Sequence, residues 1–294
     1  MTRLAPALHA MLWMVACGLL FTLLNAVLRM LAQQLDPMVA QFLRNAFGAV
    51  VMLPFILRAG LAAYRPKEMR GQVWRGLVHT IGLVLWFLAV PHVPLAEITA
   101  LGFTSPLFLM LGAAIFLGER MVAARWAAAL AGFAGVLIVV APALLAGGAS
   151  SGTPWALVLL LASPVFAASS LITKALTRRD APQVIVLWQS LMVAAFSLPL
   201  ALWHWQWPSA EQWAWFAFSG LLGTAGHYCL TRAFALADLS VTQPIKFLEL
   251  VWAVLVGLLI WGEMPGLTTL LGGAVIFAST WWIARREGRG GDRG

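Results

Sequence analysis

The sequence repeats itself over a distance of 144 residues, and the repeat lies in a chain that is almost entirely apolar. Residues 76–119 align with residues 220–263 without a gap, and ten positions are identical, from Gly76 and Gly220 to Glu119 and Glu263. A duplicated membrane domain is the usual architecture of a secondary transporter, which holds its substrate between the halves. Two bundles that pack together for purely structural reasons are the alternative.

The composition excludes a soluble protein. Hydrophobic residues make up 62% of the 294 residues and charged residues 10%, whereas a soluble domain has about 25% charged residues. The formal charge of +8 does not indicate a nucleic-acid partner, because the basic residues stand in short loops beside apolar segments. Lipid is therefore the expected solvent, and anionic headgroups are the expected contacts of the loops.

Ten apolar segments are long enough to cross a bilayer, which takes about 20 helical residues. The predicted spans are 8–32, 37–58, 71–91, 95–118, 122–141, 153–177, 181–203, 210–235, 240–261 and 266–285. The predicted fold class is an all-α polytopic membrane protein with ten transmembrane helices in two five-helix repeats. We expect the first repeat at residues 1–148, the second at 149–286, and a disordered cytoplasmic tail at 287–294.

Lysine and arginine gather on one side of these spans. Sixteen of the nineteen, Arg75 among them, fall on the side of the N-terminus, while Arg29, Arg44 and Lys246 fall within spans. The positive-inside rule then predicts both termini in the cytoplasm, at a bacterial-type inner membrane. Because each half has five spans, the second half must run inverted relative to the first. We expect Arg29 and Arg44 to reach headgroups on the outer side or to pair with Asp36.

The order of short motifs resembles that of EamA-type members of the drug/metabolite transporter superfamily. The fourth span of each half ends in LGER (117–120) or WGEM (261–264), FTSPLF (103–108) precedes the first of these, and a glycine-rich fifth span follows each. The resemblance implies alternating access for small organic solutes, mostly efflux of amino acids and other metabolites. It also implies a cavity lined by the first, third, fourth, sixth, eighth and ninth helices. Leu250 stands opposite Pro106, which departs from the family pattern.

Two charged residues stand inside the ninth span. Lys246 and Glu249 are three residues apart, so they share one face of a continuous helix. Charges in a bilayer core are costly and are usually functional. These side chains are predicted to meet the carboxylate and the amine of a substrate. The alternative is a self-neutralising pair that only lowers the cost of burial.

Two histidines and a tryptophan are further candidates for substrate binding. His79 stands in the third span and His227 in the eighth, and imidazole titrates near neutrality, as a proton carrier must. Trp86 lies two helical turns beyond His79 on the same face, where its ring would suit an apolar substrate. Buried histidines bonded to backbone carbonyls and a tryptophan in the helix core are the structural alternatives.

Four more residues complete the predicted substrate site. Phe103 has a repeat partner in Phe247, so the two are predicted to form either a symmetric pair beside the cavity or equivalent core contacts. The neutral hydrogen-bonding candidates in the first, sixth and ninth spans are Asn25, Ser163 and Gln243. Hydrogen bonds between helices are the alternative role of these polar side chains.

The leading functional prediction is export of small metabolites, specifically amino acids with hydrophobic or aromatic side chains. The alternative is an uptake carrier for a larger zwitterionic or nucleoside-like metabolite. An intramembrane enzyme is excluded because the chain has no HExxH, GxSxG or phosphate-binding glycine loop. A passive channel remains open, since a carrier must saturate and a channel need not.

The expected partners follow from the same observations. A small-molecule substrate and the lipid bilayer are expected, and nucleic acid is not. No cofactor or metal is expected, since the two cysteines, Cys17 and Cys229, lie singly in apolar spans without metal-ligand spacing. We expect a monomer.

Overall fold

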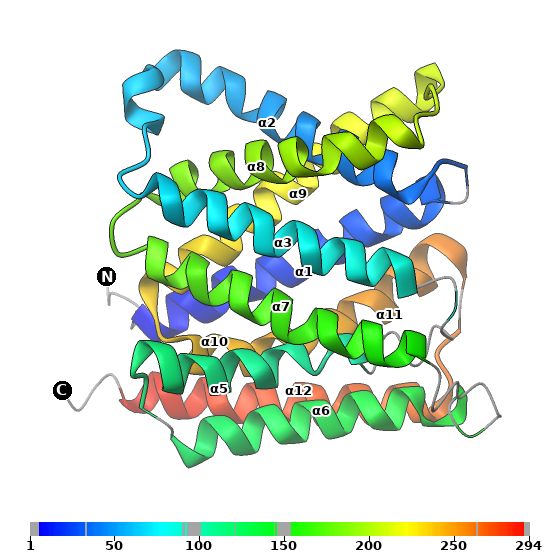
Figure 1. The fold of residues 1–294 in the computed structure, drawn as a ribbon. Helices are drawn as coiled ribbons and strands as arrows, with labels where there is room; N and C mark the ends of the chain where they lie inside the picture. The colour runs from blue at the N-terminus through cyan, green and yellow to red at the C-terminus, as the bar shows by residue number, and fades with distance from the viewer. Residues whose placement is uncertain are drawn as a thin grey trace.

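The computed structural model describes residues 6–32, 34–89, 92, 101–120, 122–143, 145, 154–262 and 264–290, and the regular structure in these residues is helical. The first half has α1 (Pro6–Ala32), α2 (Pro37–Ala59), the 3₁₀ helix η1 (Leu61–Tyr64), α3 (Met69–Ala89), α5 (Ser105–Leu117) and α6 (Ala123–Ala143). The second half has α7 (Pro154–Leu176), α8 (Pro182–Trp203), α9 (Ala210–Leu236), α10 (Leu239–Lys246), α11 (Leu248–Trp261) and α12 (Leu267–Gly290). Figure 1 shows these helices running side by side.

These helices form the ten predicted spans. Seven spans are long and apolar enough to cross a membrane, namely α1, α2, α6, α7, α8, α12 and the combined α10–α11. The shorter apolar α5 belongs to the fourth span, of which residues 95–100 lie outside the described residues. The third and eighth spans, α3 and α9, contain more polar residues, including Arg75, His79 and His227. The all-α fold class with ten spans is confirmed.

The two halves are interleaved, and equivalent helices make equivalent contacts. A Cβ on Gly82 of α3 would lie 2.9 Å from the ring of Phe166 on α7. A Cβ on Gly226 of α9 would lie 2.7 Å from the ring of Phe21 on α1. Gly82 and Gly226 are repeat partners, and so are Phe21 and Phe166 within one residue of register. The inverted repeat therefore places an aromatic ring against a bare backbone at two related positions.

The breaks and ends of helices also occur at equivalent positions of the two repeats. The ninth span breaks at Phe247, between α10 and α11, and α5 begins directly after Phe103 and Thr104. The rings of Phe103 and Phe247 stack with their centroids 5.8 Å apart, so the predicted symmetric pair forms at these two breaks. Gly118 and Gly262 end α5 and α11 with the same left-handed φ of 67°, which favours glycine. Discontinuous helices are typical of transporter binding sites.

One end of the bundle carries most of the basic residues. The start of α1 and the end of α12 lie at this end, together with the loops after α2, α5, α7 and α9 (Figure 1). We call it the basic end. Here α12 continues as a helix to Gly290, so the tail predicted from residue 287 starts too early, and residues 291–294 lie outside the described part. Glu287 accepts a hydrogen bond from Arg125 Nε at 2.9 Å, which ties this last turn to α6.

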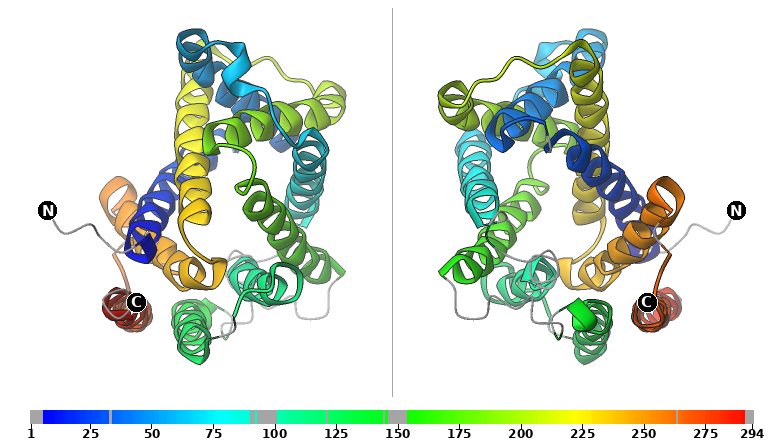
Figure 2. Two further views of the ribbon diagram at one scale, coloured as in Figure 1. Left: turned by 90° about the vertical axis from the view of Figure 1, so that its left-hand side faces the viewer. Right: turned by 90° about the vertical axis from the view of Figure 1, so that its right-hand side faces the viewer.

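Figure 2 looks along the bundle from its two ends. The fifth and tenth spans, α6 and α12, lie side by side at one edge, away from α2 and α8. Their contact is close because a Cβ on Gly272 would lie 2.4 Å from the carbonyl oxygen of Gly135. The polar helices α3 and α9 lie between these edges and pack against α7 and α1, respectively. The fold therefore concentrates polar side chains away from the lipid-facing helices.

Candidate functional site

Arg75 of α3 is the most deeply buried cation among the described residues, with 2% of its surface exposed. Its Nε donates to the hydroxyl of Thr173 at 2.5 Å, its Nη1 to the carbonyl of Ile185 at 3.0 Å, and its Nη2 to Oε1 of Gln189. The prediction that Arg75 is a loop-side topology signal is therefore wrong. The guanidinium faces α7 and α8, whose oxygens replace the water that a buried charge loses.

Gln189 links Arg75 to His227 and fixes which nitrogen of the imidazole carries the proton. Since Arg75 can only donate, Gln189 must present its oxygen to Arg75 and its NH₂ group to His227, where the Nε2–Nε2 distance is 3.1 Å. Nε2 of His227 must then accept, which puts the imidazole proton on Nδ1. That Nδ1 is buried and has no hydrogen-bond partner in the described residues. The network thus holds His227 as a neutral ring with one unused donor.

Arg44 of α2 reaches the same nitrogen of this histidine. Its Nη2 lies 3.4 Å from His227 Nε2, and its guanidinium covers Gly223 of α9, where a Cβ would lie 3.1 Å from Nε. The prediction that Arg44 reaches headgroups or pairs with Asp36 is therefore wrong. Asp36 accepts instead from the backbone N–H of Met38 at 2.8 Å and caps α2. The bare backbone of Gly223 allows Arg44 to turn inward.

His79 of α3 completes the group, which we call the central network (Arg44, Arg75, His79, Gln189 and His227). Its Nδ1 lies 3.3 Å from the hydroxyl of Ser169, and its ring meets the ring of His227 edge-to-face with centroids 5.8 Å apart. Phe21 and Phe166, the symmetric pair of rings, cover His227 and His79 at 5.0 and 5.5 Å. The structure thus brings together the two histidines that the sequence placed in separate spans.

The network lies well inside the bundle. Arg75, Gln189, His79 and His227 stand six to ten residues from the helix ends at the basic end. At 1.5 Å per residue, this depth is roughly 10–15 Å. Five helices contribute side chains or carbonyls to it, namely α2, α3, α7, α8 and α9. Both repeats therefore build one site, as expected for a carrier that moves one half against the other.

Lys246 and Glu249 do not form the predicted pair. The break at Phe247 separates them onto two helices, and no ion pair joins them in the described residues. The backbone of Glu249 lies against α1, where the Thr22 hydroxyl donates to its carbonyl at 3.4 Å. Both side chains are partly buried. A self-neutralising contact is therefore not what offsets their burial.

Ser163, Gln243 and Trp86 lie in contacts within the bundle, whereas Asn25 does not. Ser163 donates to the carbonyl of Leu101 at 2.9 Å, and Gln243 is 1% exposed and contacts Thr242 at 3.3 Å. Trp86 packs in a small cluster with Trp155, Leu159 and neighbouring apolar side chains. Asn25 is exposed on α1. Of the nine predicted site residues, only the histidines join the central network.

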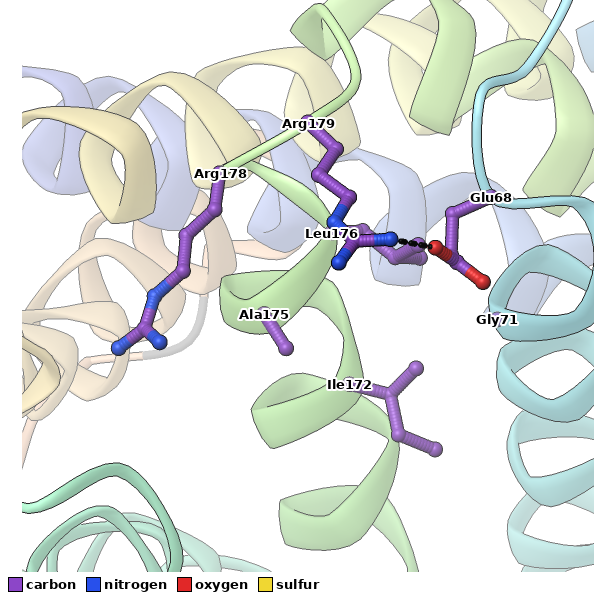
Figure 3. Close-up of a pocket in the computed structure, with 7 residues that line it drawn as sticks. All are labelled: Glu68, Gly71, Ile172, Ala175, Leu176, Arg178 and Arg179. Atoms are coloured by element: carbon purple, nitrogen blue, oxygen red, sulfur yellow. Dashed lines mark hydrogen bonds and ion pairs between the residues drawn. The ribbon is translucent and has the colours of Figure 1, made fainter.

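Two hollows open at the basic end on either side of α7. The first, of about 450 Å³, lies between α3 and α7 and is lined by the residues of Figure 3. There Arg179 forms an ion pair with Glu68, and Arg178 points away from that pair. The second, of about 400 Å³, is lined by Glu119, Lys174, Arg178, Asp238 and neighbouring residues. None of the nine predicted site residues lines either hollow.

The glutamate of the LGER motif has a structural role that sequence reasoning missed. The carboxylate of Glu119 accepts from the backbone N–H groups of Leu239 and Ser240 at 2.8 and 3.1 Å, and so caps the start of α10. Lys174 donates to the carbonyls of Phe234 and Ala237 at the end of α9, at 2.6 and 2.7 Å. The Glu119 contact joins the two halves at the basic end, and the Lys174 contact joins α7 to the end of α9 within the second half. The duplicated Glu119–Glu263 pair was the available signal.

The described residues contain no group of histidine, cysteine and carboxylate side chains that could hold a metal ion. What they contain is a set of hydrogen-bond donors, aromatic rings and cations at the meeting of two inverted repeats. This arrangement defines a membrane carrier of the drug/metabolite transporter type.

The chain belongs to the EamA-like transporter family, whose pattern matches residues 8–141 and again residues 153–285. It is 38% identical over 282 residues to a protein named riboflavin transporter from Rhizobium johnstonii, covering 95% of this chain and 91% of that one. It is 27% identical to an S-adenosylmethionine uptake transporter from Rickettsia conorii, with 90% and 88% covered. A crystal structure at 21% identity has the same fold, with a TM-score of 0.81 and 94% and 98% covered.

The family match confirms several predictions together. The protein is a multi-pass membrane transporter of the drug/metabolite transporter superfamily, and it is not an enzyme. Gln189 and Thr173 of the site were not predicted as substrate neighbours. Each is a polar residue inside an apolar span, which is the only signal the sequence carries for them.

Proposed function

We propose that this protein is an uptake carrier for riboflavin or a closely related flavin. The observation that carries the proposal is the 38% identity with a riboflavin transporter over nearly the whole of both chains. Uptake of a larger metabolite is the alternative that the sequence left open. Export of amino acids, the leading prediction from the sequence, has no support among the relatives described above.

The central network suits such a substrate. A flavin has a flat three-ring system, one edge of which carries two carbonyls and an N–H group, and a hydroxylated side chain. The network offers aromatic faces at Phe21 and Phe166 and donors at Arg44 and His227. Aromatic rings stack on flat apolar surfaces, and buried donors select acceptors that pair with them.

The proposal includes the orientation of the protein in the membrane. We place the basic end in the cytoplasm, because lysine and arginine are retained there during membrane insertion. This orientation puts both termini on the inner side of the inner membrane. The protein acts as a monomer, since both repeats needed for the site belong to one chain.

Uptake into proteoliposomes tests the function. Riboflavin fluorescence inside washed proteoliposomes should rise to a saturable level above that of protein-free liposomes. Lumiflavin should compete, whereas tryptophan and S-adenosylmethionine should not. Saturable tryptophan or S-adenosylmethionine transport without riboflavin transport would replace the proposal by amino-acid export or by uptake of the second metabolite. Flux that rises linearly with concentration would instead indicate a channel.

A further inference from the structure

We infer that Arg44 is the specificity-determining residue of the central network and binds electron-rich oxygens of the substrate. This inference rests on the proposed function, under which the oxygens are the two carbonyls of the flavin ring edge. Arg44 and Arg75 have the same side chain, and each is connected to His227, Arg75 through Gln189 and Arg44 directly. They differ in how many of their nitrogens donate to protein, and the inference rests on this difference.

Every nitrogen of the Arg75 guanidinium is bonded to protein. Each of its three nitrogens donates to an oxygen of α7 or α8. Three of its five N–H groups are used in this way, and they hold α3 to α7 and α8. Arg75 is therefore a positioning residue, which orients His227 through Gln189.

Arg44 is not saturated. Its one hydrogen bond to protein is the 3.4 Å contact with His227, and its Nε and Nη1 have no partner in the described residues. Neither nitrogen is fully buried, because neither is among the fully buried side-chain atoms that lack a hydrogen-bond partner. A guanidinium presents planar N–H groups that match carbonyl and carboxylate oxygens. Arg44 therefore keeps N–H groups at Nε and Nη1 that no described residue accepts.

Charge strengthens this inference. The three ion pairs formed by described residues all lie at the basic end and join Arg125 or Arg179 to carboxylates. Among the described residues, the middle of the bundle contains Arg44, Arg75 and Lys246 and one carboxylate, that of Glu249. A buried cation without a counter-charge is costly. A substrate that brings oxygen acceptors offsets this cost, and a cationic substrate increases it.

His227 adds a second donor, at Nδ1, on the other ring nitrogen from the Nε2 that Arg44 contacts. Arg75 and Gln189 fix its proton on Nδ1, which is buried and has no acceptor in the described residues. An unpaired buried N–H is unfavourable, so a conformation that pairs it with a substrate oxygen gains stability. A ligand with several acceptors, such as a flavin, can pair with both donors.

Binding of riboflavin and lumiflavin to the purified protein in lipid nanodiscs, measured by flavin fluorescence, tests the inference. Lumiflavin has the ring but lacks the hydroxylated chain. Arg44→Gln should weaken the Kd for both ligands by about 10- to 100-fold, as expected when a charged hydrogen-bond donor is lost. Arg44→Lys should recover part of the affinity. The matched control is Arg58→Gln, which changes an exposed arginine in the last turn of the same helix and should leave both Kd values unchanged.

The outcomes separate this inference from the proposed function. If the parent binds flavins and Arg44→Gln, folded with the parent's melting temperature, binds both as tightly, the role of Arg44 is wrong. A loss for riboflavin alone would place Arg44 at the hydroxylated chain and overturn the ring-edge assignment. If the parent binds no flavin, the proposed function fails. In that case uracil and succinate serve as oxygen-rich probes: thermal stabilisation that Arg44→Gln abolishes supports the acceptor site, and the same response in both proteins, stabilisation or none, overturns it.

Discussion

The basic end and the centre of this carrier use the same kinds of charged residue in opposite ways. At the basic end, Arg179 pairs with Glu68, Arg125 pairs with Glu287, and Glu119 caps a helix. At the centre, Arg44 and Arg75 form no ion pair with any described carboxylate. Charges that are neutralised within the protein stabilise one conformation of the helices. At the centre, Arg75 is held by hydrogen bonds to protein, whereas Arg44 keeps N–H groups for a ligand.

The comparison also separates two depths of the membrane. Near the headgroups an exposed ion pair gains little, because water and salt screen it. In the middle of the bundle each unpaired polar group costs more, so every hydrogen bond of Arg75 matters. Mutations in the two regions should therefore differ in size, and the following predictions run from the largest effect to the smallest.

The largest expected effect belongs to Arg75→Met, which removes the guanidinium and leaves the oxygens of Thr173, Ile185 and Gln189 without their donor. Stranded buried acceptors cost about 1–3 kcal/mol each. We expect a loss of stability of roughly 3 kcal/mol or more and a much lower melting temperature in detergent. A melting temperature equal to that of the parent would show that Arg75 does not hold the centre together.

Gly226→Ala should have the next largest effect. The new methyl group would lie 2.7 Å from the ring of Phe21, which itself covers His227. Forcing an atom into a packed contact costs about 1–3 kcal/mol, and the displaced ring should raise the KM for uptake. Gly273→Ala is the matched control, because a Cβ there meets nothing within 4 Å and alanine favours a helix. If both variants behave alike, close packing at the symmetric rings is not required.

Glu119→Ala removes the cap of α10 at the basic end. Loss of a helix cap costs about 1–2 kcal/mol, and the end of α5 and the start of α10 should separate more often. Ala235 is exposed and lines the second hollow at the basic end, as Glu119 does. A cysteine introduced at Ala235 should therefore be labelled faster by a thiol reagent added from the basic end when this end opens. If labelling and stability are both unchanged, Glu119 does not help to close the basic end.

The smallest effect is expected for Glu68→Gln, which breaks the exposed ion pair with Arg179 shown in Figure 3. Exposed pairs contribute about 0–1 kcal/mol, and salt screens them. The melting temperature should fall by a degree or two at low salt, and the difference from the parent should vanish at high salt. A large loss of stability that does not depend on salt would show that an ion pair at the basic end contributes nearly as much as the hydrogen bonds at the centre.

The spans were predicted well because their cause is local. About 20 apolar residues are needed to cross a bilayer whatever surrounds them, and each predicted span coincides with a helix wherever residues are described. The Phe103–Phe247 pair could also be predicted, because an inverted repeat brings equivalent positions near its axis. The tail was misplaced because Glu287 bonds to a distant helix.

The centre was predicted only in part. His79 and His227 stood out as polar residues in apolar spans, and the structure joins them. Arg44 and Arg75 were assigned to headgroups and loops, because a basic residue near the end of a span usually points there. Lys246 and Glu249 were assigned to one face of a continuous helix, which the break at Phe247 interrupts.

The sequence by itself determined the number of spans, their inversion between the halves and the end at which the basic residues collect. These properties depend on local apolarity and on counts of charge. Only the tertiary structure decided which charges meet. The rotation of each helix about its axis sets whether Arg44 faces lipid or His227, and that rotation follows from packing against other helices, as at Gly223, where the absence of a side chain leaves room for the guanidinium.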